Sequence, residues 1–183
     1  MKKVLLAGFF AALVTFVWSM VSWMMMPWHE AQINHFTNNP QVAETMLANA
    51  PKDGIYAFPC IMKYPKTGIE KPYTFTVIAR NGMNPNGFLP SVVQSFLLQC
   101  ISFGLVAWLL SKIPNLSFKN TVLYTLLIQI SGNLFCLMDS VWMYFPWSYT
   151  GLIVLDQAIA SVLGGLVLAC MLGNDDAAST RPA

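Results

Sequence analysis

Four long apolar runs, separated by polar segments, dominate the pattern of hydrophobic and polar residues. They cover residues 4–26, 90–111, 120–145 and 150–172. A helix of about 20 apolar residues crosses the roughly 30 Å hydrocarbon core of a bilayer, because it rises 1.5 Å per residue. The pattern therefore predicts an all-α membrane protein, a four-helix transmembrane bundle that forms a single membrane domain over residues 1–183.

The first apolar run follows Lys2 and Lys3, an arrangement that signal peptides share. A cleaved signal peptide has a shorter apolar core and small residues before its cleavage site. Here the run ends in the bulky sequence WMMMPW at residues 23–28. We therefore expect this run to stay attached as a membrane anchor.

The longest polar segment, residues 27–89, predicts a small α+β cap outside the cytoplasm. Asn39 followed by Pro40 favours a helix start, so we expect a short helix over residues 41–50. Alternating side chains predict strands at residues 55–62 and 72–80, joined by a loop at 63–71. An isolated hairpin is marginally stable in water, so the cap should lean on the helix ends or on a partner.

The basic residues near the spans predict the orientation, because short cytoplasmic loops are enriched in Lys and Arg. Lys2 and Lys3 precede the first span, Lys112 and Lys119 separate the second from the third, and Arg181 follows the fourth. Four spans place all of them on one side, which predicts cytoplasmic termini. Interfacial aromatic residues agree with this orientation. Those at the expected outer boundary are Trp23, Trp28, Trp142, Tyr144, Trp147 and Tyr149.

Composition excludes several classes of function. The chain is 56% hydrophobic and 10% charged, whereas soluble domains are roughly a quarter charged, so the bilayer is the expected surrounding. The net charge of +2, without a basic helix face, argues against nucleic acid as a partner. The four cysteines form no C-x-x-C pair, which argues against a disulfide relay and a structural zinc site. Cys60, in the cap, is either a free thiol or paired with another chain.

Two carboxylates within the apolar runs are the sharpest candidates for a functional site. Asp139 and Asp156 are placed symmetrically about a turn expected at residues 147–148, which predicts equal depth in an antiparallel hairpin. His29 and Glu30 follow the first span near the same level. A cluster of these residues could bind a metal or relay protons. Alternatively, the aspartates accept hydrogen bonds that fix the hairpin, or contact a partner; the sequence identifies neither a metal nor a cofactor.

Small and polar residues recur at helical spacing within the spans. Close helix packing with interhelical hydrogen bonds explains this pattern. The alternative is a polar conduit through Gln99, Gln129 and Asn133. Packing is favoured, because no charged residue is expected deep in the membrane between these groups. The small faces of the first and fourth spans are Gly8, Ala12, Thr15, Ser19 and Ser22, and Ala158, Ser161, Gly165 and Ala169.

Two stretches carry a resemblance to other proteins. Residues 19–29 (SMVSWMMMPWH) and 139–157 (DSVWMYFPWSYTGLIVLDQ) resemble a set of small bacterial four-span integral membrane proteins without an assigned activity. The resemblance covers most of the chain and implies the bacterial inner (plasma) membrane. It carries over no catalytic residue.

The sequence favours a non-enzymatic interaction or accessory role for a multi-pass membrane protein. The contacts would be made by the cap and the small-residue helix faces, with a second copy or another membrane protein as partner. Two alternatives stay open. One is an oligomeric transporter or channel that uses Asp139 and Asp156; the other is a membrane metalloprotein or enzyme with a site formed by His29 and both aspartates.

Overall fold

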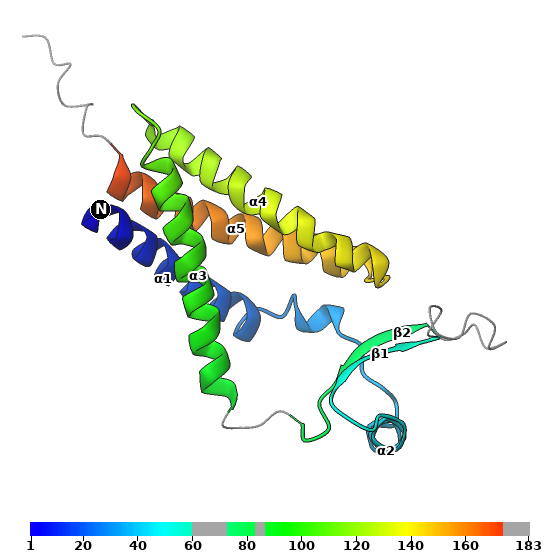
Figure 1. The fold of residues 1–183 in the computed structure, drawn as a ribbon. Helices are drawn as coiled ribbons and strands as arrows, with labels where there is room; N and C mark the ends of the chain where they lie inside the picture. The colour runs from blue at the N-terminus through cyan, green and yellow to red at the C-terminus, as the bar shows by residue number, and fades with distance from the viewer. Residues whose placement is uncertain (60–72, 83–86, 174–183) are drawn as a thin grey trace, which may run out of the picture. The chain divides into compact units, whose positions relative to one another are not determined.

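The computed structural model describes residues 1–59, 73–82 and 87–173, and these are mostly helical. Four helices are long and apolar enough to cross a membrane, which confirms the four long apolar helices expected from the sequence. Cys60, Arg181 and the loop predicted at 63–71 lie outside the described residues. The elements in Figure 1 are α1 (Lys2–Met24), the 3-10 helix η1 (Glu30–Gln32), α2 (Asn39–Asn49), β1 (Gly54–Phe58), β2 (Thr74–Ile78), α3 (Phe88–Leu110), α4 (Phe118–Trp142) and α5 (Trp147–Leu172).

The chain divides into two compact units. One comprises Met1–Gln32 and Ser91–Ala183, and it contains the long helices. The other, Ile33–Pro90, contains α2 and the two strands. We refer to them as the helical unit and the cap unit.

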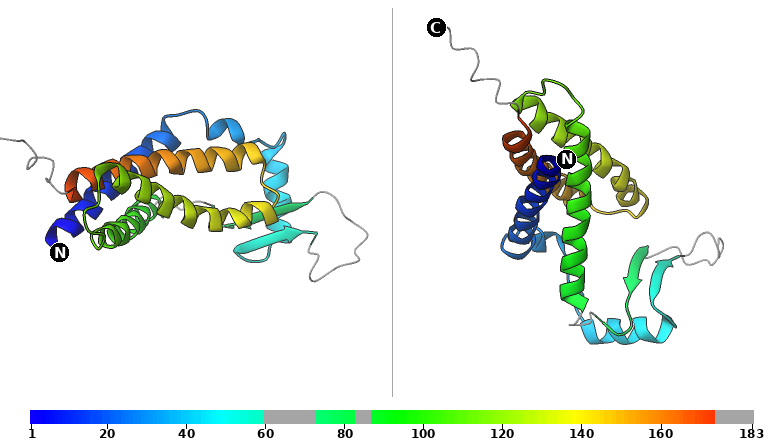
Figure 2. Two further views of the ribbon diagram at one scale, coloured as in Figure 1. Left: turned by 90° about the horizontal axis from the view of Figure 1, so that it is seen from above. Right: turned by 60° about the vertical axis from the view of Figure 1, so that its left-hand side comes forward.

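In the helical unit, α4 and α5 form an antiparallel hairpin, α1 packs along α5, and α3 crosses the other three obliquely (Figures 1 and 2). The apolar core lies where α1 begins and where α3 and α5 end. It consists of Ala7, Ala11, Ala12, Phe103, Val106, Ala107, Leu110 and Leu168. The core residues that α1 contributes are all alanines. Because their side chains are small, the helices can approach one another closely.

Glycines mark the closest helix contacts. A Cβ atom at Gly8 would lie 2.8 Å from the Cα atom of Gly104, so the backbones of α1 and α3 meet there. A Cβ atom at Gly165 would lie 3.1 Å from the Cα atom of Val122 on α4. Most of the predicted small-residue faces of α1 and α5 are buried, which supports the packing interpretation. The buried members are Gly8, Ala12, Thr15 and Ser22, and Ser161, Gly165 and Ala169.

Local interactions determine where the α4–α5 hairpin begins and where the chain reverses direction. The side chain of Ser117 caps α4 by accepting a hydrogen bond from the backbone N–H of Asn120 at 3.3 Å. After α4, Tyr144 adopts a left-handed backbone conformation with φ of 58°. Pro146 then immediately precedes α5. The reversal is therefore complete within residues 143–146.

In the cap unit, Asn38 caps α2 by accepting a hydrogen bond from the N–H of Gln41 at 3.2 Å. β1 and β2 pair antiparallel, from Gly54 opposite Ile78 to Phe58 opposite Thr74. The guanidinium of Arg80 donates to the carbonyl oxygens of Leu47 and Ala50, which joins the end of α2 to the hairpin. The predicted helix and strands are present, and the described parts of the strands are shorter than expected.

Candidate functional site

Asp156 is a buried carboxylate in the helical unit. It lies on α5 with 6% of its surface exposed. Because α5 runs from Trp147 to Leu172, Asp156 lies only about 5 Å along the axis from the helix midpoint. A carboxylate buried near the middle of a long apolar helix requires partners, since an apolar environment solvates neither charge nor hydrogen-bonding groups.

Both carboxylate oxygens of Asp156 have a partner. The indole Nε1 of Trp18, on α1, donates to Oδ1 at 2.7 Å. The imidazole Nε2 of His29 lies 3.2 Å from Oδ2. Asp156 therefore ties α5 both to α1 and to the segment that follows α1.

His29 reaches Asp156 because the chain folds back after α1. The N–H groups of Met25 and Met26 both bond the carbonyl oxygen of Val21, which closes the end of the helix. His29 is then only 1% exposed, and its Nε2 lies 3.0 Å from the hydroxyl oxygen of Ser22. Its position, seven residues beyond Ser22, shows how completely this segment reverses.

Three indoles enclose the site. The ring of Trp23 stacks on that of His29 with a centroid distance of 3.9 Å and an interplanar angle of 7°. Trp28 meets the same imidazole edge-on at 5.8 Å, and its Nε1 donates to the backbone oxygen of Ser22 at 3.1 Å. The ring of Trp18 meets that of Trp28 edge-on at 6.2 Å, so the three indoles form a continuous group beside the buried imidazole. We call Trp18, Ser22, Trp23, Trp28, His29 and Asp156 the polar cluster.

The polar cluster contains Ser, His and Asp, but their arrangement is not that of a hydrolytic triad. In a triad the carboxylate binds one imidazole nitrogen and the serine hydroxyl binds the other. Here Ser22 and Asp156 both lie against Nε2 of His29, at 3.0 and 3.2 Å. Nδ1 is buried without a hydrogen-bond partner among the described residues. The geometry suits a structural tie between α1 and α5.

The structure unites two of the four predicted site residues. His29 and Asp156 are in contact, whereas Glu30 and Asp139 are exposed. Asp139 makes no hydrogen bond through its side chain to any described residue. In the part of the chain that the structure describes, no three His, Cys, Asp or Glu residues are grouped as a metal site requires.

The expectation that Asp139 and Asp156 lie at equal depth is wrong. α4 ends at Trp142 and α5 begins at Trp147, so the hairpin is centred near residues 144–145. This centre precedes the predicted one by about three residues, because Trp147 already belongs to α5. Asp156 is consequently deeper than Asp139 by about six residues, or about 9 Å along the helix axis. Its counterpart at equal distance from the turn is close to Asn133.

Two of the three predicted helix-packing amides join helices at mid-depth. Thr15 on α1 donates to Oε1 of Gln99 on α3 at 2.9 Å. The hydroxyl of Ser102 on α3 lies 3.2 Å from Oε1 and 3.1 Å from Nε2 of Gln129 on α4. Asn133 makes no side-chain hydrogen bond within the described ranges. The amides of Gln99 and Gln129 therefore hold α3, the obliquely crossing helix, to its neighbours.

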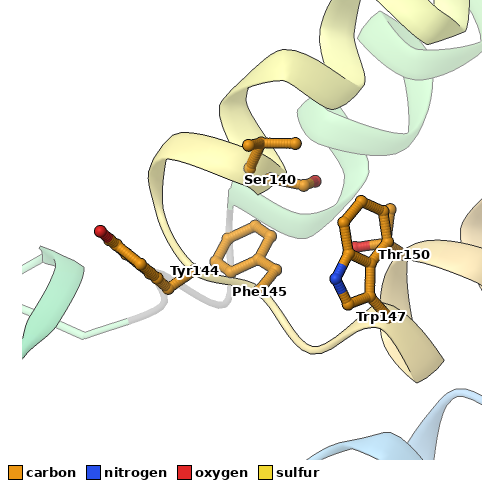
Figure 3. Close-up of a pocket in the computed structure, with 6 residues that line it drawn as sticks. Ser140, Tyr144, Phe145, Trp147 and Thr150 are labelled. Atoms are coloured by element: carbon orange, nitrogen blue, oxygen red, sulfur yellow. The ribbon is translucent and has the colours of Figure 1, made fainter.

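A partly aromatic pocket of about 220 Å³ lies at the turn between α4 and α5. Figure 3 shows Phe145 and Trp147 between the end of α4 and Thr150, with the hydroxyl of Tyr144 directed away from Thr150. The hydroxyl of Thr150 is buried and has no hydrogen-bond partner among the described residues. The other residues that line this pocket are Ser140 and Val141.

The indoles of the polar cluster were missed as site residues, because the sequence assigned Trp23 and Trp28 to the membrane interface. Trp18 carried a usable signal, since an indole N–H deep in a membrane needs an acceptor and Asp156 is an acidic residue within an apolar run. The chain matches no family model, no curated protein and no solved structure.

Proposed function

We propose that the chain is a non-enzymatic accessory protein of the bacterial inner membrane, and that the outer half of α4 contacts a protein partner. This proposal rests on the position of one residue, Asp139. It is an exposed carboxylate on α4, about five residues before the turn, without a hydrogen bond to any described side chain or backbone group. A carboxylate in a membrane helix is costly and usually faces a partner or water.

The neighbours of Asp139 on α4 support a contact surface. Phe135 and Trp142 lie four residues before it and three after it, so all three share one helix face. Phe135 is 78% exposed and Trp142 is 75% exposed. Large aromatic side chains around a charged group are typical of the residues that dominate binding energy in interfaces.

The polar groups inside the helical unit favour this role over the two alternatives. Asp156 and His29 bond each other and α1, and the amides of Gln99 and Gln129 bond neighbouring helices. These groups are thus used for holding the helices together. A transport site formed by both aspartates finds no support, because Asp139 is exposed and lies at a different depth from Asp156.

The arrangement of helix ends supports cytoplasmic termini. Lys3 at the start of α1 lines a common pocket with Ser111 after α3 and Leu172 at the end of α5. The start of α1, the α3–α4 connection and the end of α5 therefore lie at one end of the helical unit, together with their basic residues. Positive charge gathered at one end favours the cytoplasmic side.

Cysteine labelling tests this orientation. In a chain without its native cysteines, Trp147→Cys should react with a membrane-impermeant maleimide in intact cells. Lys119→Cys should react only after the membrane is permeabilised, because it lies at the start of α4, at the opposite end of the hairpin from Trp147. Labelling of Lys119→Cys in intact cells, with Trp147→Cys protected, would reverse the assignment.

Photocrosslinking in native membranes tests the contact surface. A photoreactive amino acid at Phe135 should give an adduct with a second polypeptide, which mass spectrometry can identify. The matched control is Leu98 on α3, which is 66% exposed and should give mainly lipid adducts. Asp139→Asn should remove most of the protein adduct at position 135, because it removes the carboxylate that the partner is expected to bind.

Two outcomes of this experiment would contradict the proposal. One is a crosslink from position 135 to residues 33–90 of the same chain, which would make the cap unit the group that covers Asp139. The other is an equal yield of protein adducts from positions 135 and 98, which would indicate nonspecific collisions in the membrane.

A further inference from the structure

We propose that a pocket at mid-depth in the helical unit binds the uncharged, oxygen-bearing head of a molecule dissolved in the lipid. The pocket has a volume of about 120 Å³ and is lined by all four long helices. Its lining residues are Thr15, Ser19, Gln99, Ser102, Phe103, Gln129, Gln157, Ala160 and Ser161. We call it the mid-depth pocket.

The depth of the pocket follows from the helix bounds. Each long helix contributes a lining residue within two positions of its own midpoint, and these are Thr15, Gln99, Gln129 and Ala160. Helices of this length cross a bilayer with their midpoints near its centre. The polar lining therefore lies in the most apolar layer of the membrane.

Several hydrogen-bond donors in the lining of the pocket have no well-placed acceptor among the other lining residues. Each glutamine amide has two N–H groups. One from Gln99 has only a long contact of 3.4 Å to the hydroxyl of Ser19, and both amide atoms of Gln129 meet the single hydroxyl of Ser102. The amide of Gln157 makes no side-chain hydrogen bond within the described ranges. Since hydrocarbon satisfies none of these donors, the pocket favours a ligand with oxygen acceptors.

The ligand should be uncharged, because none of the lining residues is ionisable. The nearest acidic residue in sequence is Asp156, and both of its carboxylate oxygens are already bonded to Trp18 and His29. The ring of Phe103 supplies an apolar wall against which a planar or alkyl head can pack. Carbonyl and hydroxyl heads fit these properties, as found in isoprenoid quinones and diacylglycerols.

The exposed side chain of Gln157 indicates that the ligand enters from the lipid. Gln157 lines the pocket and is also exposed on the surface of the helical unit. At the midpoint of the helices this surface faces hydrocarbon, so a solute from water would have to cross half of the bilayer. A molecule that already resides in the bilayer core reaches the opening directly.

Binding of decyl-benzoquinone to the full-length protein in lipid nanodiscs tests the proposal. Photolabelling with an azido derivative should saturate with concentration, and unlabelled decyl-benzoquinone should compete. Gln157→Leu should weaken binding by about tenfold, because it removes a hydrogen bond to the head. Ala160→Phe should abolish binding by filling the pocket. Gln94→Leu is the matched control, since Gln94 is exposed on α3 outside this lining, and it should bind like the unmodified chain.

Competition by dioctanoylglycerol distinguishes the two sources of the ligand. If it displaces the photolabel more effectively than decyl-benzoquinone does, the pocket prefers a glyceride head; the reverse order indicates a quinone. Both results support the proposal. Labelling of the unmodified chain that fails to saturate, or that is equal in Ala160→Phe, would overturn it. Access of a water-soluble thiol reagent to Ala160→Cys would overturn entry from the lipid.

Discussion

Gly8→Leu is expected to force α1 and α3 apart and to destabilise the helical unit by about 3 kcal/mol or more. A Cβ atom at Gly8 would lie 2.8 Å from the Cα atom and 3.0 Å from the nitrogen of Gly104, and 3.1 Å from the backbone oxygen of Phe103. All three atoms belong to the backbone of α3, so no change of side-chain rotamer can relieve the contact. The free energy of unfolding can be measured by denaturant titration in detergent micelles.

Gly151→Leu is the matched control for this prediction. A Cβ atom at Gly151 on α5 would meet nothing within 4 Å, so the leucine side chain has open space. Because leucine has a higher helix propensity than glycine, this variant should be neutral or more stable by up to about 1 kcal/mol. Equal stabilities of the two variants would show that α1 and α3 do not cross at Gly8 and Gly104.

The long helices were predictable from the sequence because their cause is local. An apolar run of about 20 residues has few alternatives to a membrane-spanning helix, since every backbone polar group must be bonded within the segment. The small faces were predictable for the same reason, as residues four positions apart lie on one side of a helix. The positions of Gly8, Thr15 and Gly165 in helix contacts follow from that spacing.

The candidate site was harder to predict because it depends on where the chain reverses. Moving the centre of the hairpin by three residues changes the residue opposite Asp156 by six, from Asp139 to the neighbourhood of Asn133. Propensity fixes such a boundary only to within a few residues. The burial of His29 likewise depends on the reversal after Met24, which returns the imidazole to Ser22. Neither reversal has a periodic signal in the sequence.

Asp156→Leu is expected to destabilise the helical unit by about 3–5 kcal/mol, the usual loss when one partner of a buried polar pair is removed. The indole N–H of Trp18 and the Nε2 atom of His29 would lose their carboxylate acceptors in a buried site. Asp156→Asn should cost less, about 1–2 kcal/mol, because its amide oxygen can still accept from Trp18. Measurement of unfolding for both variants separates the loss of hydrogen bonding from the loss of charge.

The double variant Asp139→Asn/Asp156→Asn should be additive. Asp139→Asn should change the stability of the isolated chain by less than about 0.5 kcal/mol, because Asp139 is exposed and its carboxylate has no hydrogen bond within the described structure. Residues that are distant and share no partner contribute independently to the free energy of unfolding. Equal depth would instead have predicted coupling between the two carboxylates. A coupling energy above about 1 kcal/mol in this cycle would therefore restore the shared site. It would contradict the separate roles, in which Asp156 holds α1 to α5 and Asp139 is proposed to face a partner.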